Sequence, residues 1–176
     1  MPLAKTHSVA LVGVTGHLVE VEVDIANGLV GMILVGLPDT ALREARDRIH
    51  AAIVNSGEEW PYRKITVGLS PASLPKRGSW FDLAIAIGIL AAAAKVPRAA
   101  VEEVMFFGEL GLDGQLRPVR GVLPAVAAAV HGPHPAVEAE LAEDHHPGAH
   151  RRRTLAVRGQ QPDCCRGLAP RQARVQ

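Results

Sequence analysis

Strict alternation of apolar and polar residues in two stretches of the chain predicts two half-buried β-strands, because successive side chains of a strand point to opposite faces of its sheet. In residues 18–25, valine or isoleucine alternates with the acids Glu20, Glu22 and Asp24, and residues 65–69 show the same period. We interpret the three acids as the solvated face of a strand rather than as a carboxylate cluster for acid–base chemistry.

Two further apolar runs, at residues 8–14 and 31–37, flank the first alternating stretch. Turn residues separate the three runs at Thr15-Gly16 and at Asn27-Gly28. Tight turns between consecutive strands favour antiparallel neighbours. We therefore expect these three strands to form a meander.

Helical spacing of apolar residues predicts a first helix that begins at Asp39, whose carboxylate suits an N-cap, and ends at Gly57, a suitable C-cap. The polar side of this helix carries charges of both signs, which indicates a solvated face rather than a contact with nucleic acid. These residues are Arg43, Glu44, Arg46, Asp47 and Arg48.

The segment from Ser79 to Asp82 has the spacing of a capping box, and the apolar run that follows, residues 83–94, predicts a central buried helix. Residues 104–119 are typical of a hairpin on the two-residue turn Asp113-Gly114, and a last helix is expected over residues 119–131. The order β-β-β-α-β-α-β-β-α predicts an α+β fold.

Residues 131–176 contain no isoleucine, lysine or aromatic residue, and only six valines or leucines. A segment of this composition cannot bury enough apolar surface to offset the entropy lost on ordering. We expect one folded domain over residues 1–132. Residues 133–176 are expected to be a low-complexity tail, either disordered or the product of a frameshift.

The composition excludes several classes of protein. A formal net charge of +1 gives no general attraction to nucleic acid or to acidic membranes. The adjacent Cys164 and Cys165 provide no disulfide framework, the first residues do not resemble a signal peptide, and the apolar run 83–94 is too short to cross a membrane. We expect a cytoplasmic location and no membrane partner.

Neither a nucleotide site nor a metal site is expected. The sequence has no G-x-x-x-x-G-K-[ST] and no G-x-G-x-x-G motif. His145, His146 and His150, together with Cys164 and Cys165, match no zinc spacing. We expect this chain to hold no cofactor.

The loop from Leu74 to Ser79 is the most specific local feature, because it joins a predicted strand to the buried helix. Ser79 could be a nucleophile, but a serine needs a general base beside it. The preferred interpretation is that Ser79 caps the helix while Pro75 and Gly78 shape the turn.

Three segments carry a resemblance to a known family: VGLPDTALREARDRIHAAIVNSG, ITVGLSPASLPKRGSWFDLAIAIGIL and FFGELGLDGQLRPVRGVLPAV. Residues 8–130 resemble the amino-terminal, Lon-like (ChlI-type) domain of the ComM/YifB family of Mg-chelatase-like AAA+ ATPases. The resemblance implies a ribosomal protein S5 domain 2-like fold, shared with the proteolytic domain of Lon and the carboxy-terminal domain of RadA. It also implies a family role in DNA branch migration, recombination and competence for natural transformation.

The Lon resemblance also implies where a Ser–Lys dyad would lie. Matching the stretch from Pro75 to Ser79 puts Trp80 at the position of the serine, and matching Gly121 puts Ala125 at that of the lysine. Residues 119–132 contain no lysine. The resemblance thus implies a peptidase scaffold without its dyad, and no catalytic residue.

We therefore expect a non-catalytic domain that is not an enzyme by itself. Its expected partners are the AAA+ module or ring subunits of a full-length parent and, through that parent, DNA. After Val130 the chain departs from the family pattern, which favours a truncated or frameshifted product. Two alternatives stay open: a Lon-like serine peptidase that uses Ser79, and a small DNA-binding module.

Overall fold

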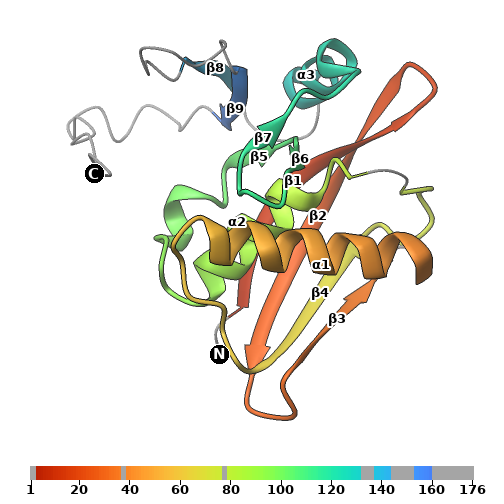
Figure 1. The fold of residues 1–176 in the computed structure, drawn as a ribbon. Helices are drawn as coiled ribbons and strands as arrows, with labels where there is room; N and C mark the ends of the chain where they lie inside the picture. The colour runs from red at the N-terminus through yellow and green to blue at the C-terminus, as the bar shows by residue number, and fades with distance from the viewer. Residues whose placement is uncertain (1–2, 37–38, 77–78, 132–136, 144–152, 160–176) are drawn as a thin grey trace.

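The computed structural model describes residues 3–36, 39–76, 79–131, 137–143 and 153–159. The elements, in chain order, are β1 (Leu3–Val12), β2 (Thr15–Ala26), β3 (Gly31–Val35), α1 (Asp39–Asn55), β4 (Lys64–Ser70), α2 (Asp82–Ala92), the 3-10 helix η1 (Arg98–Ala100), β5 (Val104–Phe106), β6 (Glu109–Leu110), β7 (Leu116–Arg117), α3 (Val122–His131), β8 (Val137–Glu143) and β9 (Arg153–Gly159). The chain is a mixed α/β protein with a mixed sheet, compatible with the expected α+β class (Figure 1).

The main sheet has the strand order β3-β4-β2-β1-β5-β9-β8, so the predicted meander of the first three strands is wrong. β1 and β2 form the expected hairpin, but β4 pairs antiparallel with β2 and parallel with β3. The helix α1 is the crossover between β3 and β4. Burial fits this order: on the open face of the sheet, Ile33 and Val35 of β3 are about half exposed, whereas their partners Thr66 and Gly68 of β4 are only partly exposed, which suits an edge position for β3.

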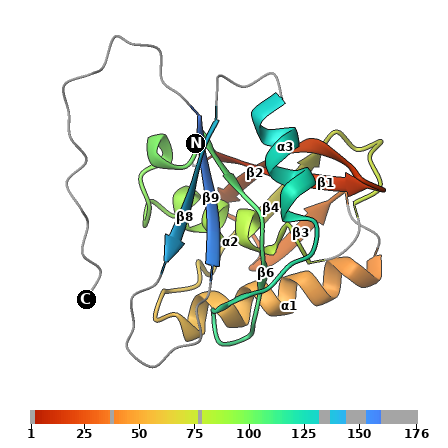
Figure 2. The same ribbon diagram turned by 90° about the horizontal axis from the view of Figure 1, so that it is seen from above.

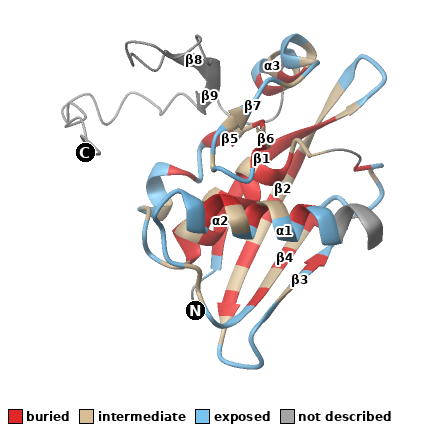
Figure 3. Ribbon diagram, viewed as in Figure 1, coloured by how far each residue is buried: buried red, intermediate tan, exposed pale blue. Residues whose placement is uncertain are grey.

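One face of the sheet is covered by α1 and α2, and the core lies between these layers (Figures 2 and 3). The residues of α2 are apolar on nearly every side, and most of them are buried, as the sequence predicts. A Cβ on Gly88 would lie 2.7 Å from Val23 Cγ2, so α2 approaches β2 as closely as a glycine allows. Thr6 Oγ1 of β1 donates a hydrogen bond of 2.9 Å to the Ala84 carbonyl of α2.

The helix α1 ends at Asn55, and Gly57, the glycine predicted to cap it, has a positive φ of 84°. The Gly57 N–H donates to the Val54 carbonyl at 3.0 Å, and the Glu58 N–H donates to the Ile53 carbonyl at 3.2 Å. This pair of bonds is the Schellman motif, in which a residue in left-handed conformation satisfies the last carbonyls of a helix.

The opposite face of the sheet is covered at one end by α3. Val9 points away from α2 and is fully buried in a small apolar cluster, which we call the α3 cluster: Val9, Met105, Phe107, Ala125 and Ala129, with Trp80 among the partly buried residues packed against it. A Cβ on Gly16 would lie 2.5 Å from Ala128 Cβ, so the β1–β2 hairpin lies directly against α3.

The hairpin predicted over residues 104–119 differs in two ways from the observed strands. β5 joins the main sheet, where Met105 is in register with His7 of β1, and only β6 and β7 form the hairpin. The Gly111 N–H donates to the Gln115 carbonyl at 2.8 Å, and Gly114 has a φ of 77°. These features define a three-residue loop whose last residue is left-handed, instead of a two-residue turn.

Two strands, β8 and β9, lie within residues 133–176, and β9 pairs antiparallel with β5. The division of the chain at residue 132 and the nature of the tail stay predictions. Within the described residues, no helix is long and apolar enough to cross a membrane.

Candidate functional site

The loop between β4 and α2 is organised by a buried lysine. Lys76 is 2% exposed, and its ammonium donates to the carbonyl of Pro71 and, at 3.4 Å, to that of Leu74. Burial lowers the pKa of Lys76 below its ordinary value. The amine therefore holds the loop together through the carbonyls of Pro71 and Leu74 rather than through Ser79.

The structure does not support Ser79 as the cap of the buried helix. Helix α2 begins at Asp82, its N-cap is Phe81, and no side chain donates or accepts a capping hydrogen bond there. The Asp82 N–H donates to the Ser79 carbonyl at 3.2 Å, so the serine backbone performs part of the task expected of its side chain.

The Ser79 hydroxyl instead donates to Glu109 Oε2 of β6 at 2.5 Å. A hydroxyl-to-carboxylate bond is short and strong because the acceptor is charged. This bond joins the loop to the β6–β7 hairpin. In a triad of the general serine type a base accepts the hydroxyl proton and a third group orients that base. Here the Ser79 hydroxyl donates to the Glu109 carboxylate instead of to a histidine or lysine base.

A buried ion pair lies beside this bond. Asp82 is 1% exposed, and Arg48 of α1 donates to it twice, from Nε at 2.8 Å and from Nη2 at 3.3 Å. Burial raises the pKa of Asp82 to about 6, the Arg48 guanidinium opposes this rise, and the charge of Glu109 adds to it. The two-pronged geometry is the one that best compensates a carboxylate removed from water.

The two positions at which the Lon resemblance implies a Ser–Lys dyad lie in the same cluster, but both are occupied by side chains that cannot act as nucleophile or base. Trp80 and Ala125 belong to the same α3 cluster, although they lie on different elements. The ring centroids of Trp80 and Phe107 are 5.2 Å apart with an interplanar angle of 58°, and Ala125 is 3% exposed. Packing occupies the place where the resemblance implies a serine and a lysine.

The acidic strand face is solvent-accessible, as predicted, and is partly paired. The Lys5 ammonium lies 3.1 Å from Glu20 and 2.9 Å from Glu22. These charges neutralise each other on the open face of β1 and β2. On the same face, His7 Nε2 lies 3.9 Å from Glu20 Oε2.

The other candidates are placed as follows. Arg43, Glu44, Arg46 and Asp47 are exposed along α1, as expected of a solvated face, whereas Arg48 turns inward to Asp82. Among the described residues there is no group of three His, Cys, Asp or Glu side chains that could hold a metal ion. His145, His146, His150, Cys164 and Cys165 lie outside the described residues.

The roles of three residues that shape the site were not predicted: Arg48, which was expected on the solvated face of the first helix, Glu109 and Lys76. A signal was available for Asp82 and its partner, because a single acid in an apolar helix needs a cation from elsewhere. Glu109 and Lys76 carried no such signal, since their roles depend on a hairpin and a loop whose geometry the sequence pattern does not specify.

Comparison of the sequence with a family model and with individual proteins points to one family. The family described as subunit ChlI of Mg-chelatase matches residues 21–137. An uncharacterized protein of Mycobacterium tuberculosis is 53% identical over 137 residues, which are 78% of this chain and 27% of the relative. The competence protein ComM of Haemophilus influenzae is 48% identical over 73% of this chain and 25% of its own length. The uncharacterized protein YifB of Escherichia coli is 43% identical over 82% of this chain and 28% of its own length. The chain thus spans about a quarter of the length of the curated relatives that it matches.

Proposed function

Because the chain belongs to the family described as subunit ChlI of Mg-chelatase, and its relatives include ComM and YifB, we propose that it is a non-catalytic, Lon-like amino-terminal domain of a ComM/YifB-type AAA+ protein. We further propose that its fold is the ribosomal protein S5 domain 2-like one. In a full-length parent it works beside the ATPase module in the cytoplasm.

The observation that carries this proposal is the α3 cluster. A Ser–Lys mechanism needs a hydroxyl and an amine within hydrogen-bond reach of each other. The implied positions hold Trp80 and Ala125, which pack with Phe107 instead. Ser79, the alternative nucleophile, donates to Glu109, and Lys76 donates to backbone carbonyls.

A domain without catalytic residues would act by binding other proteins through its surface. We propose that its partners are the AAA+ module and ring subunits of the parent. One relative is named a competence protein, and that name supports a role of the parent in competence. A role of the parent in DNA recombination is a further part of this proposal.

A serine-reactive fluorophosphonate probe tests the absence of a nucleophile. We expect no labelling of the chain, with Ser79→Ala as the matched control and an active serine peptidase as the positive control. Labelling that is lost in Ser79→Ala, together with peptide cleavage, would show that the chain is a peptidase.

A second experiment tests whether ATP binding belongs to the ATPase module alone and whether this domain affects that module. We expect no ATP binding by the isolated chain in calorimetry. When the remaining three quarters of the Mycobacterium tuberculosis relative is added in trans, we expect its ATPase rate or ring assembly to change. ATP binding by the isolated chain, or no effect on the added module, would contradict the proposal.

A further inference from the structure

The edge strand β3 combines two features that point to a polypeptide ligand: an unprotected apolar edge and cations around it. β3 pairs with β4 on one side and is the last strand at its end of the seven-stranded sheet. The backbone N–H and C=O groups of an edge strand's outer side can pair with another strand.

The side chains along this edge give it no protection. Ile33 is 49% and Val35 57% exposed, and in the segment just before the strand Leu29 is 93% and Val30 61% exposed. The stretch from Leu29 to Val35 contains no charged residue and no proline. Natural sheets usually block an edge with lysine, proline or a bulge, because a bare apolar edge pairs with other chains.

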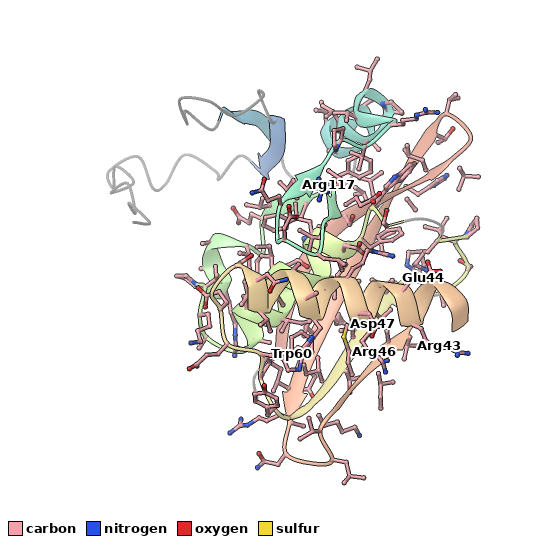
Figure 4. The ribbon with its side chains drawn as sticks, viewed as in Figure 1. Arg43, Glu44, Arg46, Asp47, Trp60 and Arg117 are labelled. Carbon is pink, nitrogen blue, oxygen red and sulfur yellow. The ribbon has the colours of Figure 1, made fainter. Side chains whose placement is uncertain are left out.

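Positive side chains lie at both ends of the strand. Lys64 is the register partner of Gly31, and the Gly31 N–H donates to the Arg63 carbonyl at 3.3 Å; both cationic residues are exposed. Beyond the other end, Arg43 and Arg46 extend from α1, with Asp47 close by, on the side of the helix nearest β3 (Figure 4). Asp47 pairs with Arg46 at 3.2 Å and compensates one of the two arginine charges at this end.

The nearest acid on the open face of the sheet, Asp24, compensates part of the charge of Lys64. Asp24 is aligned with Thr66, which lies two residues along β4 from Lys64 and is aligned with Ile33, so Asp24 lies beside β4 and two strands away from the edge strand. Counted together with Asp24 and Asp47, the two cations at each end of β3 leave a net positive charge there. The edge therefore presents an apolar strip flanked by exposed cations.

We propose that the edge of β3 is a strand-addition site for an extended segment of a partner polypeptide, with apolar residues at alternate positions and acidic residues at both flanks. Backbone pairing supplies affinity in this mode of recognition, and side chains supply selectivity. The apolar residues of the partner cover Ile33 and Val35, and its acids face the cations. A second copy of this chain fits less well, because it would bring the same exposed cations against one another. This inference is independent of the proposed function.

Synthetic peptides test the proposal directly. The probe is a fluorescent nonapeptide in which valine and threonine alternate between two glutamates at each end. We expect it to bind at least about tenfold more tightly than the same peptide with lysine flanks, and to weaken as salt rises. Equal affinity for both peptides, or no binding of the glutamate peptide at millimolar concentration, would overturn the proposal.

Backbone methylation separates strand addition from simple apolar contact. An added strand uses the amides of one of its edges only. We expect N-methylation of one alternate set of amides to abolish binding and methylation of the other set to be tolerated. Equal effects of the two methylated peptides would rule out strand pairing.

Protein variants locate the site. Ile33→Glu should lower affinity for the glutamate-flanked peptide at least about tenfold, and Arg46→Glu should lower it less, because a rim charge is screened. The matched controls are Leu123→Glu on α3, where the side chain is 81% exposed, and Arg120→Glu, which changes an exposed cation elsewhere. Circular dichroism verifies folding. A loss of binding in the controls as large as in Ile33→Glu would place the peptide elsewhere and refute the assignment.

Discussion

The segment from Ser79 to Asp82 has two different environments on its two sides. Trp80 packs into the α3 cluster, where the neighbours are Phe107, Ala125 and other apolar residues. Ser79 and Asp82 instead meet Glu109 and Arg48 between α1, α2 and β6, in what we call the polar cluster: Arg48, Ser79, Asp82 and Glu109.

The two sides of this segment differ in the kind of side chain that is buried there. The place where the Lon resemblance implies reactive groups holds only packing. The place with ionisable groups uses them in hydrogen bonds that join α1 to the start of α2 and the loop before α2 to β6. Perturbed pKa values cluster at functional sites, but structural ion pairs perturb them as well. Burial and the Arg48 guanidinium both act on the pKa of Asp82, in opposite directions.

The largest expected effect comes from placing a cation in the apolar side. Ala125→Lys should lower the free energy of unfolding by about 4 kcal/mol or more, because a buried lysine is held neutral at a cost of 1.36 kcal/mol per pKa unit. Ala127→Lys, two residues on at an exposed position of the same helix, should change it little. Urea unfolding measures both. Similar losses in the two variants would mean that Ala125 is not in a sealed apolar cluster.

Removal of one partner from the buried ion pair should cost slightly less. Arg48→Ala leaves the Asp82 carboxylate without its counter-charge, and we expect a loss of about 3 kcal/mol at pH 7.5 in urea unfolding. Arg46→Ala, on the exposed side of the same helix, is the control and should stay within about 0.5 kcal/mol of the parent. An Arg48→Ala protein as stable as the control would show that the pair contributes nothing.

Ser79 distinguishes a helix cap from a link to β6. If the hydroxyl capped α2, Ser79→Asp would keep the stability, because a carboxylate also caps. Since the hydroxyl donates to Glu109, we expect Ser79→Asp to place two negative charges together and to cost about 1–2 kcal/mol in thermal or urea unfolding. The double variant Ser79→Asp with Glu109→Gln should recover most of the loss. A fully stable Ser79→Asp protein would restore the capping interpretation.

The smallest effect is a pH dependence. The pKa of Asp82 is raised by burial from an ordinary value of 3.8 to about 6. The folded protein therefore binds a proton at pH 5 that the unfolded chain mostly lacks, so this group adds stability as the pH falls through 6. Between pH 7.5 and 5 the gain is about 1 kcal/mol. Asp82→Asn should lack this contribution. Equal pH slopes for the two proteins would contradict the raised pKa.

Local patterns in the sequence predicted the elements well. The alternation in β2 and β4, the extent of α1 with Gly57 at its end, and the buried nature of α2 all follow from period and from turn chemistry. Each of these features depends on residues that are neighbours along the chain, so a single sequence contains the necessary information.

Pairing between distant elements was not predictable in the same way. Nothing in residues 31–37 shows that β4 will separate β3 from β2, because the pairing of β4 with β2 joins residues far apart in the sequence. The role of Ser79 failed for the same reason. Its spacing to Asp82 fits a capping box, but Arg48 and Glu109 offer both side chains stronger partners from α1 and β6.

The insertion of β4 between β2 and β3 has a consequence for the order of folding. β1 and β2 are contiguous in sequence and close a short loop, whereas β2 and β4 pair residues as distant as Glu20 and Ser70. Closing the longer loop costs more chain entropy, so local hairpins form early and such pairings late. β3 has no partner until β4 arrives. A growing or refolding chain therefore keeps β3, a strand without polar side chains, unpaired until the crossover through α1 brings β4 beside it.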